Sequence, residues 1–134
     1  MRYGLAWAAS ALIAAAPAVA AAQAADISGH WETTYGPLVF TVTDIRDAQG
    51  NVTGKAAEAP YRSEGGTVAG ELRGSNLDGY WHEPHSSERC ATERRGTFYW
   101  GRIRFTFNPA ADAYEGVWGY CDETPERGWT GTRG

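Results

Sequence analysis

The chain has 134 residues and a formal net charge of −4, but its first 25 residues differ from the rest. They contain 13 Ala and no acid, whereas residues 25–134 carry 11 Lys and Arg and 16 Asp and Glu, a net charge of about −5. That second segment is long enough for one domain with one core. Its glycines and aromatic residues exclude a collagen-like chain, a long helical bundle and a disordered segment. Its acidity argues against nucleic acid as a partner.

The N-terminal segment has the pattern of a signal peptide. A basic residue precedes the apolar run 5–16, and an Ala-x-Ala motif at 22–24 predicts the cleavage site, with a second candidate at 18–20. We therefore expect a signal peptide over 1–24 and one exported domain over 25–134, in the periplasm or outside the cell. No later run reaches the ~18 apolar residues of a transmembrane segment.

Export changes the interpretation of the two cysteines. In an oxidising compartment Cys90 and Cys121 are expected to form one disulfide that closes a segment of about 30 residues. The alternative is a reactive thiol, but neither cysteine has a C-x-x-C neighbour that would lower its pKa.

The pattern of residues 25–134 predicts an all-β fold. Apolar residues alternate with polar ones between Gly, Asn, Asp and Pro, and no long segment has the 3.6-residue helical period. We expect an antiparallel up-and-down meander of about eight strands, with the third the weakest. The strands are expected at 28–35, 38–45, 51–57, 67–72, 77–83, 97–107, 113–120 and 128–133.

Alternation also selects the side chains of the core. Residues two apart on a strand share a face, so three strands each carry an apolar face. These faces are Leu38, Phe40 and Val42; Tyr99, Ile103, Phe105 and Phe107; and Tyr114, Trp118 and Tyr120.

Glycine recurs two positions before an apolar residue, as in Gly79-Tyr80-Trp81 and Gly116-Val117-Trp118. We expect each glycine to leave space beside a large ring on its own strand and to allow sharp coiling. A small closed barrel needs this, and so does a strongly curved sandwich.

In a meander the connections after the odd-numbered strands lie at one end. These connections are 36–37, 58–66, 84–96 and 121–127, so both cysteines fall at the same end. A disulfide requires Cα atoms within about 7 Å, which agrees with this placement. We therefore expect this loop-rich end to be the functional end.

The stretch Gly29-His30-Trp31 resembles the first strand of the calycin superfamily, the avidins and lipocalins, which carries a Gly-x-Trp. The resemblance implies a small eight-stranded barrel, in which a basic residue of the last strand packs across the Trp. Arg133 is the candidate for packing on Trp31. Thr33 and Pro37 replace the Asn and Ser with which avidins bind biotin, so the resemblance extends to the fold and not to biotin.

A metal site and an active site are less well supported. His82, Glu83 and His85 are close in sequence, but they lack the spacing of structural zinc sites. We expect no metal and no cofactor. Loop acids such as Asp122-Glu123 provide the carboxylates for a hydrolase alternative, but no catalytic motif accompanies them.

The sequence therefore favours an exported, non-catalytic protein that binds a small ligand. The candidate ligand-binding residues at the loop-rich end are Tyr35, Trp81, His82, Trp118 and Tyr120. One alternative is an inhibitor or docking module that meets a secreted or envelope protein through loops 84–96 and 121–127. The hydrolase is the second alternative.

Overall fold

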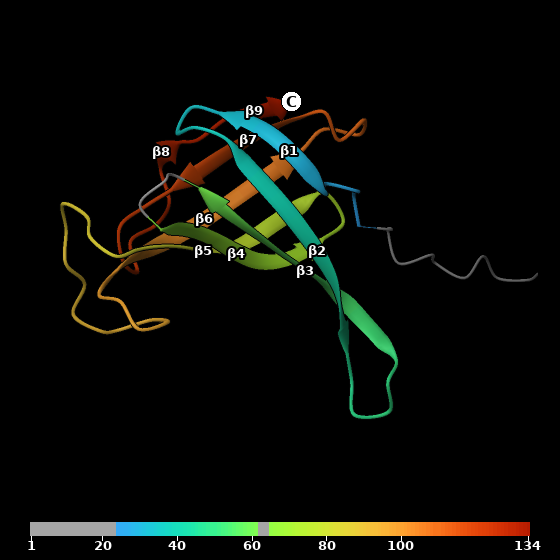
Figure 1. Cartoon of the computed structure of the whole chain (residues 1–134), viewed down its shortest axis with the longest axis horizontal. Helices are drawn as coiled ribbons and strands as arrows, with labels where there is room; N and C mark the ends of the chain where they lie inside the picture. The colour runs from blue at the N-terminus through green and yellow to red at the C-terminus, as the bar shows by residue number, and fades with distance from the viewer. Residues whose placement is uncertain (1–23, 62–64) are drawn as a thin grey trace, which may run out of the picture.

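The computed structural model describes residues 24–61 and 65–134 (Figure 1). The expected signal peptide at 1–24 lies outside these residues except for its last position. No helix within the described residues is long and apolar enough to cross a membrane. The described residues form the strands β1 (Gly29–Thr33), β2 (Leu38–Arg46), β3 (Val52–Tyr61), β4 (Gly66–Arg73), β5 (Asn76–Glu83), β6 (Tyr99–Phe107), β7 (Ala113–Trp118), β8 (Arg127–Gly128) and β9 (Gly131–Arg133).

The strands close into a barrel. Each strand from β1 to β7 pairs antiparallel with the next, and β9 pairs with both β7 and β1, which completes a ring of eight strands. The short strand β8 pairs with the end of β7. The expected all-β antiparallel meander is thus confirmed, and closure decides for a barrel over a curved sandwich.

Two expected strand boundaries are wrong. The third strand extends to Tyr61, beyond the expected end at residue 57, and so occupies much of the expected loop 58–66. The pairing of β2 with β3 ends at Glu58, so Pro60 has a strand neighbour only on the β4 side and lies where its missing N–H is tolerated. The expected last strand is divided into β8 and β9, since Trp129 and Thr130 separate them.

The barrel interior contains most of the expected core. Leu38, Ile103 and Phe105 are buried, and Val42, Trp118 and Tyr120 are partly buried against the same cluster. Tyr99 is the exception, because it is partly exposed and its ring lies 4.8 Å from that of His85. The largest fully buried side chains are Trp31, Trp100, Phe105, Ile27, Leu38, Leu77 and Val68.

Several glycines accommodate a ring on the neighbouring strand, not on their own strand as expected. In each case the aromatic residue is the register partner of the glycine, and a Cβ on the glycine would overlap the ring. The pairs are Gly66 with Tyr61, Gly101 with Trp81, Gly116 with Phe105, and Gly131 with Tyr114. Gly79 instead allows close approach of the β4 backbone. Glycine opposite an aromatic residue is a known device of strongly curved sheets.

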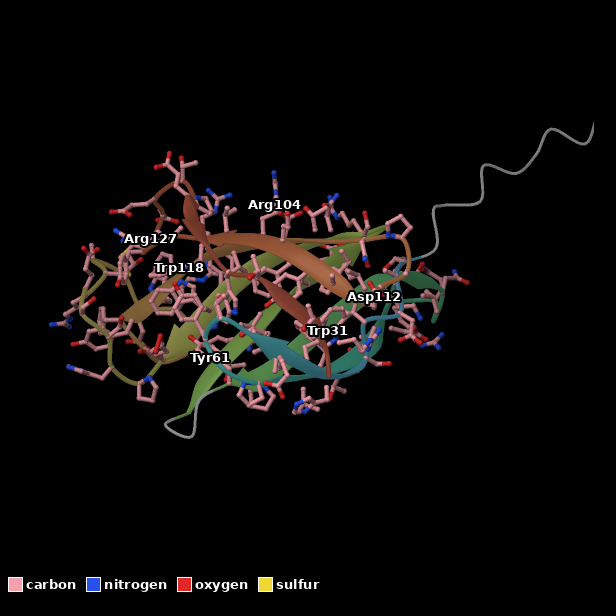
Figure 2. The ribbon with its side chains drawn as sticks, turned by 90° about the horizontal axis from the view of Figure 1, so that it is seen from above. Trp31, Tyr61, Arg104, Asp112, Trp118 and Arg127 are labelled. Atoms are coloured by element: carbon pink, nitrogen blue, oxygen red, sulfur yellow. A yellow bond between two sulfur atoms is a disulfide. The ribbon has the colours of Figure 1, made fainter. Side chains whose placement is uncertain are left out.

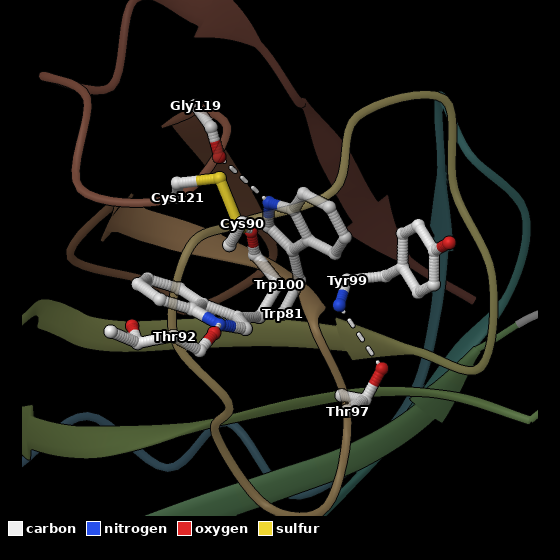
Figure 3. The surroundings of a disulfide bond; sticks show 8 residues. All are labelled: Trp81, Cys90, Thr92, Thr97, Tyr99, Trp100, Gly119 and Cys121. Carbon is white, nitrogen blue, oxygen red and sulfur yellow. Dashed lines mark hydrogen bonds between the residues drawn. A yellow bond between two sulfur atoms is a disulfide. The ribbon is translucent and has the colours of Figure 1, made fainter.

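The disulfide between Cys90 and Cys121 is present, with Cα atoms 5.5 Å apart. It joins the long connection after β5 to the residues that follow β7 (Figure 3). Both connections therefore lie at one end of the barrel, as the meander predicts.

Candidate functional site

A cavity of about 270 Å³ lies at the disulfide end of the barrel. Figure 2 shows Trp118 and Tyr61 toward this end and Trp31 and Asp112 toward the other. Most of the lining is aromatic, and the polar groups come from the end of β5 and the loop after it. The lining residues are Tyr35, Tyr61, Trp81, Trp118, Tyr120 and Trp129, with Glu83, His85, Ser86 and Ser87.

Strand alternation explains why these rings face inward. Trp81 and Glu83 lie two apart on β5, so both point to the barrel interior. Trp118 ends β7, and Tyr120 follows it on the same face. Tyr35 comes from the turn after β1 and reaches Trp118 across the barrel mouth. Thus three separate chain segments bring rings to one place.

The walls of the cavity are held by hydrogen bonds within the protein. The indole N–H of each lining tryptophan already donates to the chain, and the Tyr120 hydroxyl bonds to a serine. The bonds are Trp81 to the Gly119 carbonyl (2.9 Å), Trp118 to the Tyr35 hydroxyl (3.1 Å), Trp129 to the Thr33 hydroxyl (3.0 Å) and Tyr120 with Ser87 (2.9 Å). The tryptophans consequently offer a ligand their ring faces and edges.

The rings also support one another. Trp118 meets Tyr35, Trp81 and Tyr120 edge to face, with centroids 5.0–5.9 Å apart. This separation is favourable for aromatic pairs, each of which contributes about 0.5–1.5 kcal/mol beyond area burial. The Arg127 guanidinium carbon lies 5.4 Å from the Trp118 ring centroid. Trp118 is therefore the central ring of the wall.

The disulfide fixes the loop beside the cavity. Figure 3 shows Trp81, bonded to the Gly119 carbonyl, close to the Cys90–Cys121 bridge. The Cys90 N–H donates to the Phe98 carbonyl (2.8 Å), which makes a narrow neck in the long loop. The Trp100 indole N–H donates to the Thr92 carbonyl (2.8 Å) from the outer face. The loop is thus attached to the barrel at several points.

His82, predicted to bind a ligand at this end, does not line the cavity. It alternates with Trp81 and Glu83, so its ring lies on the outer face of β5, where it is 7% exposed. Burial, together with the positive charges of Arg95 and Arg94, lowers the pKa of His82 to about 4, and Glu58 opposes this shift. His82 is thus a neutral, buried group outside the aromatic cavity.

The candidate metal ligands and the candidate hydrolase carboxylates lie apart from the aromatic cavity or do not form a group. Among residues 24–61 and 65–134 no three His, Cys, Asp or Glu side chains gather into a potential metal site, so His82, Glu83 and His85 form no such group. Asp122 and Glu123, the hydrolase candidates, are exposed in the connection after β7.

The opposite end of the barrel is closed. The Arg133 guanidinium carbon lies 4.5 Å from the ring centroid of Trp31, the arrangement that the calycin resemblance implies. Arg133 also donates to the carbonyls of Asp26 (2.7 Å), Ala111 (2.9 Å) and Ser28. These bonds join three segments across the barrel end.

Sequence reasoning selected Tyr35, Trp81, Trp118 and Tyr120 among the lining residues and missed others. Tyr61 falls in the expected loop 58–66, and Trp129 falls on the expected last strand 128–133 without being selected as a site residue. Ser86 and Ser87 lie in the loop after β5, where no periodic signal indicates direction.

Searches of known protein families, of curated proteins and of solved structures give no match to this chain. The geometry of the barrel and its cavity is therefore the basis for a functional assignment.

Proposed function

We propose that this protein is an exported, non-catalytic binding protein that holds a small, largely apolar, ring-sized molecule in the aromatic cavity. The observation that carries the proposal is a cavity of about 270 Å³ walled by six aromatic side chains at the loop-bearing end. Ligand sites in proteins are mostly apolar hollows with a few polar groups at their edge. Glu83, Ser86 and Ser87 supply such an edge here.

The cavity volume limits the size of the ligand. A cavity of about 150 Å³ holds benzene, and drug-sized ligands use about 300–1,000 Å³. The cavity here lies between these cases, so a molecule of one or two rings is the best fit. Because the indole N–H groups are bonded within the protein, ring stacking and apolar contact would dominate recognition.

Two further features support the proposal. The closed eight-stranded barrel, with Arg133 over Trp31, agrees with a calycin-like relationship, and such barrels have room for one small ligand. The Cys90–Cys121 disulfide is compatible with an oxidising compartment and so with export to the periplasm or beyond.

The proposal is tested by filling the cavity. Ser86 lines it and is partly exposed, so Ser86→Trp should place a ring in the ligand volume with little cost to the fold. We expect the neutral dye N-phenyl-1-naphthylamine to bind the wild type and to bind Ser86→Trp at least about tenfold more weakly, a loss of about 1.4 kcal/mol. Dye fluorescence measures the affinity.

The matched control is Glu88→Trp, which adds the same ring to the same loop at an exposed position outside the cavity lining. This variant should bind the dye as the wild type does. Native mass spectrometry of protein purified from its own host should also show a co-purifying small molecule. A well-folded wild type that binds no dye and carries no molecule would contradict the proposal.

A further inference from the structure

A second hollow, of about 700 Å³, lies on the outer face of the barrel over β2 to β5. Its floor consists mainly of short side chains, and its rim is polar and charged. The floor residues include Thr41, Thr43, Ala56, Thr67, Ala69 and Gly70. Tyr80, His82 and Glu58 lie at the end of the hollow that the long loop after β5 reaches, together with Arg94 and Arg95 from that loop.

A tight turn carries the two arginines to this face. Arg94 and Thr97 exchange both backbone hydrogen bonds, at 2.9 and 3.0 Å, and Arg95 and Gly96 between them have φ values of 48° and 79°. Positive φ at both central positions is typical of a type I′ turn. The turn places the Arg94 guanidinium carbon 3.5 Å from the ring centroid of Tyr80. Its position is therefore defined by stacking as well as by the turn.

The hollow contains buried polar atoms without partners. His82 is 7% exposed, and neither of its ring nitrogens has a hydrogen-bond partner among the described residues. The same holds for Nε of Arg94. An unsatisfied buried polar group costs about 1–3 kcal/mol, and such groups are uncommon in native proteins. Two residues with this deficit beside one hollow indicate a ligand that supplies the missing partners.

The charge around the hollow specifies the kind of partner. Among the described residues no carboxylate lies within 4 Å of Arg94, whereas Arg95 is 3.3 Å from Glu58. Arg102, the register partner of Tyr80 on β6, adds a further positive charge on the same outer face. Two further carboxylates of the lining, Glu71 and Asp78, are each paired with an arginine, Arg73 and Arg104. The Arg94 end of the hollow is thus locally positive, which favours an anion there.

We propose that the outer hollow is a second binding site, separate from the aromatic cavity, that takes the oxyanion of a small acidic molecule between Arg94 and His82. The Arg94 Nε–H and the N–H of neutral His82 donate to the oxyanion, which accepts both bonds. The body of the ligand lies over the threonine and alanine floor. Because these nitrogens have almost no solvent-exposed surface, the side chain of Arg95, which lines the same end and is 54% exposed, moves aside to admit the oxyanion.

The test follows His82 directly. The imidazole nitrogens of ¹⁵N-labelled protein are observed by NMR during titration with sodium acetate, phosphate and sulfate, while sodium chloride keeps the ionic strength constant. We expect at least one anion to perturb His82 saturably and to raise its pKa, because a bound oxyanion favours the imidazolium. A comparison of the affinity for acetate with the affinities for phosphate and sulfate shows whether the site prefers a planar carboxylate or a tetrahedral oxyanion.

Matched variants identify the residues. Arg94→Gln should weaken anion binding at least about tenfold, because a charge-assisted hydrogen bond is lost. His82→Phe, followed by calorimetry, should do the same. Arg46→Gln removes an equal charge from an arginine that is paired with Asp44 outside the lining of the hollow, so it should leave affinity unchanged.

Three results would overturn the proposal. They are a His82 signal that no anion perturbs, an equal loss of affinity in Arg46→Gln, or unchanged affinity in Arg94→Gln. Because Arg94 lies on a surface turn, that variant remains informative if His82→Phe does not fold. Ser86→Trp, which fills the other cavity, should bind the anion normally, so the two proposals fail independently.

Discussion

His82 should couple the stability of this protein to pH. Its pKa of about 4 in the folded protein is below its unfolded value near 6.5, chiefly because the ring is buried and also because Arg95 and Arg94 repel a proton. The unfolded chain therefore binds a proton more readily between these two values, and the folded state is penalised as pH falls. We expect His82 to cost about 1–3 kcal/mol of unfolding free energy between pH 6.5 and 4, with no further loss from this residue below pH 4.

The measurement is urea unfolding of the wild type and of His82→Phe from pH 7 to 4. The difference in stability between the two proteins should change in favour of the variant as pH falls. His85→Phe, an exposed change in the following loop, is the control and should keep the pH dependence of the wild type. Parallel curves for wild type and His82→Phe would show that His82 does not titrate as the structure implies.

At the scale of strands, the glycine and aromatic partners determine how tightly the barrel can close. A Cβ at Gly101 would overlap both the Gly119 carbonyl oxygen and the Trp81 indole, which are bonded to each other. Gly101→Ala should therefore displace Trp81 from the cavity wall and cost about 3 kcal/mol or more in unfolding free energy. Urea unfolding measures the cost, and near-ultraviolet circular dichroism reports the displaced tryptophan.

Gly128→Ala is the matched control for this prediction. Nothing lies within 4 Å of a Cβ at Gly128 and its φ is not positive, so the same substitution should change stability by about 0.5 kcal/mol or less. If the two alanine variants change stability equally, the cost at Gly101 comes from a general effect of replacing glycine and not from the loss of space for Trp81.

Alternation predicted the strands well because most strands have one buried face and one more exposed face, although His82 and Trp100 are buried on the outer face. It failed at Pro60, which continues β3 because the pairing with β2 has already ended at Glu58 and only β4 pairs there. The expectation also placed the aromatic ring beside each glycine on the glycine's own strand, whereas the ring comes from the neighbouring strand. Register decides which ring faces which glycine, and a single sequence does not contain the register.

The candidate site, like the strands, could be predicted only where it follows from strand alternation. Inward positions on strands, such as Trp81 and Trp118, follow from period two, and the loop-rich end follows from the meander. His82 was expected in the same site as Trp81, although neighbouring residues of a strand face opposite sides. The stacking of Arg94 on Tyr80, which brings the turn to the outer hollow, joins residues distant in sequence, so the hollow had no signal in the sequence.

On the scale of the whole molecule, the two ends of the barrel are held together in different ways. Hydrogen bonds from Arg133 hold one end, and a disulfide holds the other. At the first end Arg133 donates hydrogen bonds to three carbonyls in two other segments. The Cys90–Cys121 disulfide spans 31 residues and holds the loop that borders both hollows. Removing the disulfide should therefore affect the two ends unequally.

The double variant Cys90→Ala/Cys121→Ala should lose about 3–4 kcal/mol of unfolding free energy, the loop entropy expected for a segment of this length. Hydrogen exchange should show faster opening across 84–98, because the loop is then held to the barrel only by noncovalent contacts such as the hydrogen bond from Trp100 to Thr92. Amides near Trp31 should open only with the whole barrel. The reduced wild type should behave as the variant does. A uniform loss of protection at both ends would contradict the prediction, because it would mean that the barrel opens as one unit.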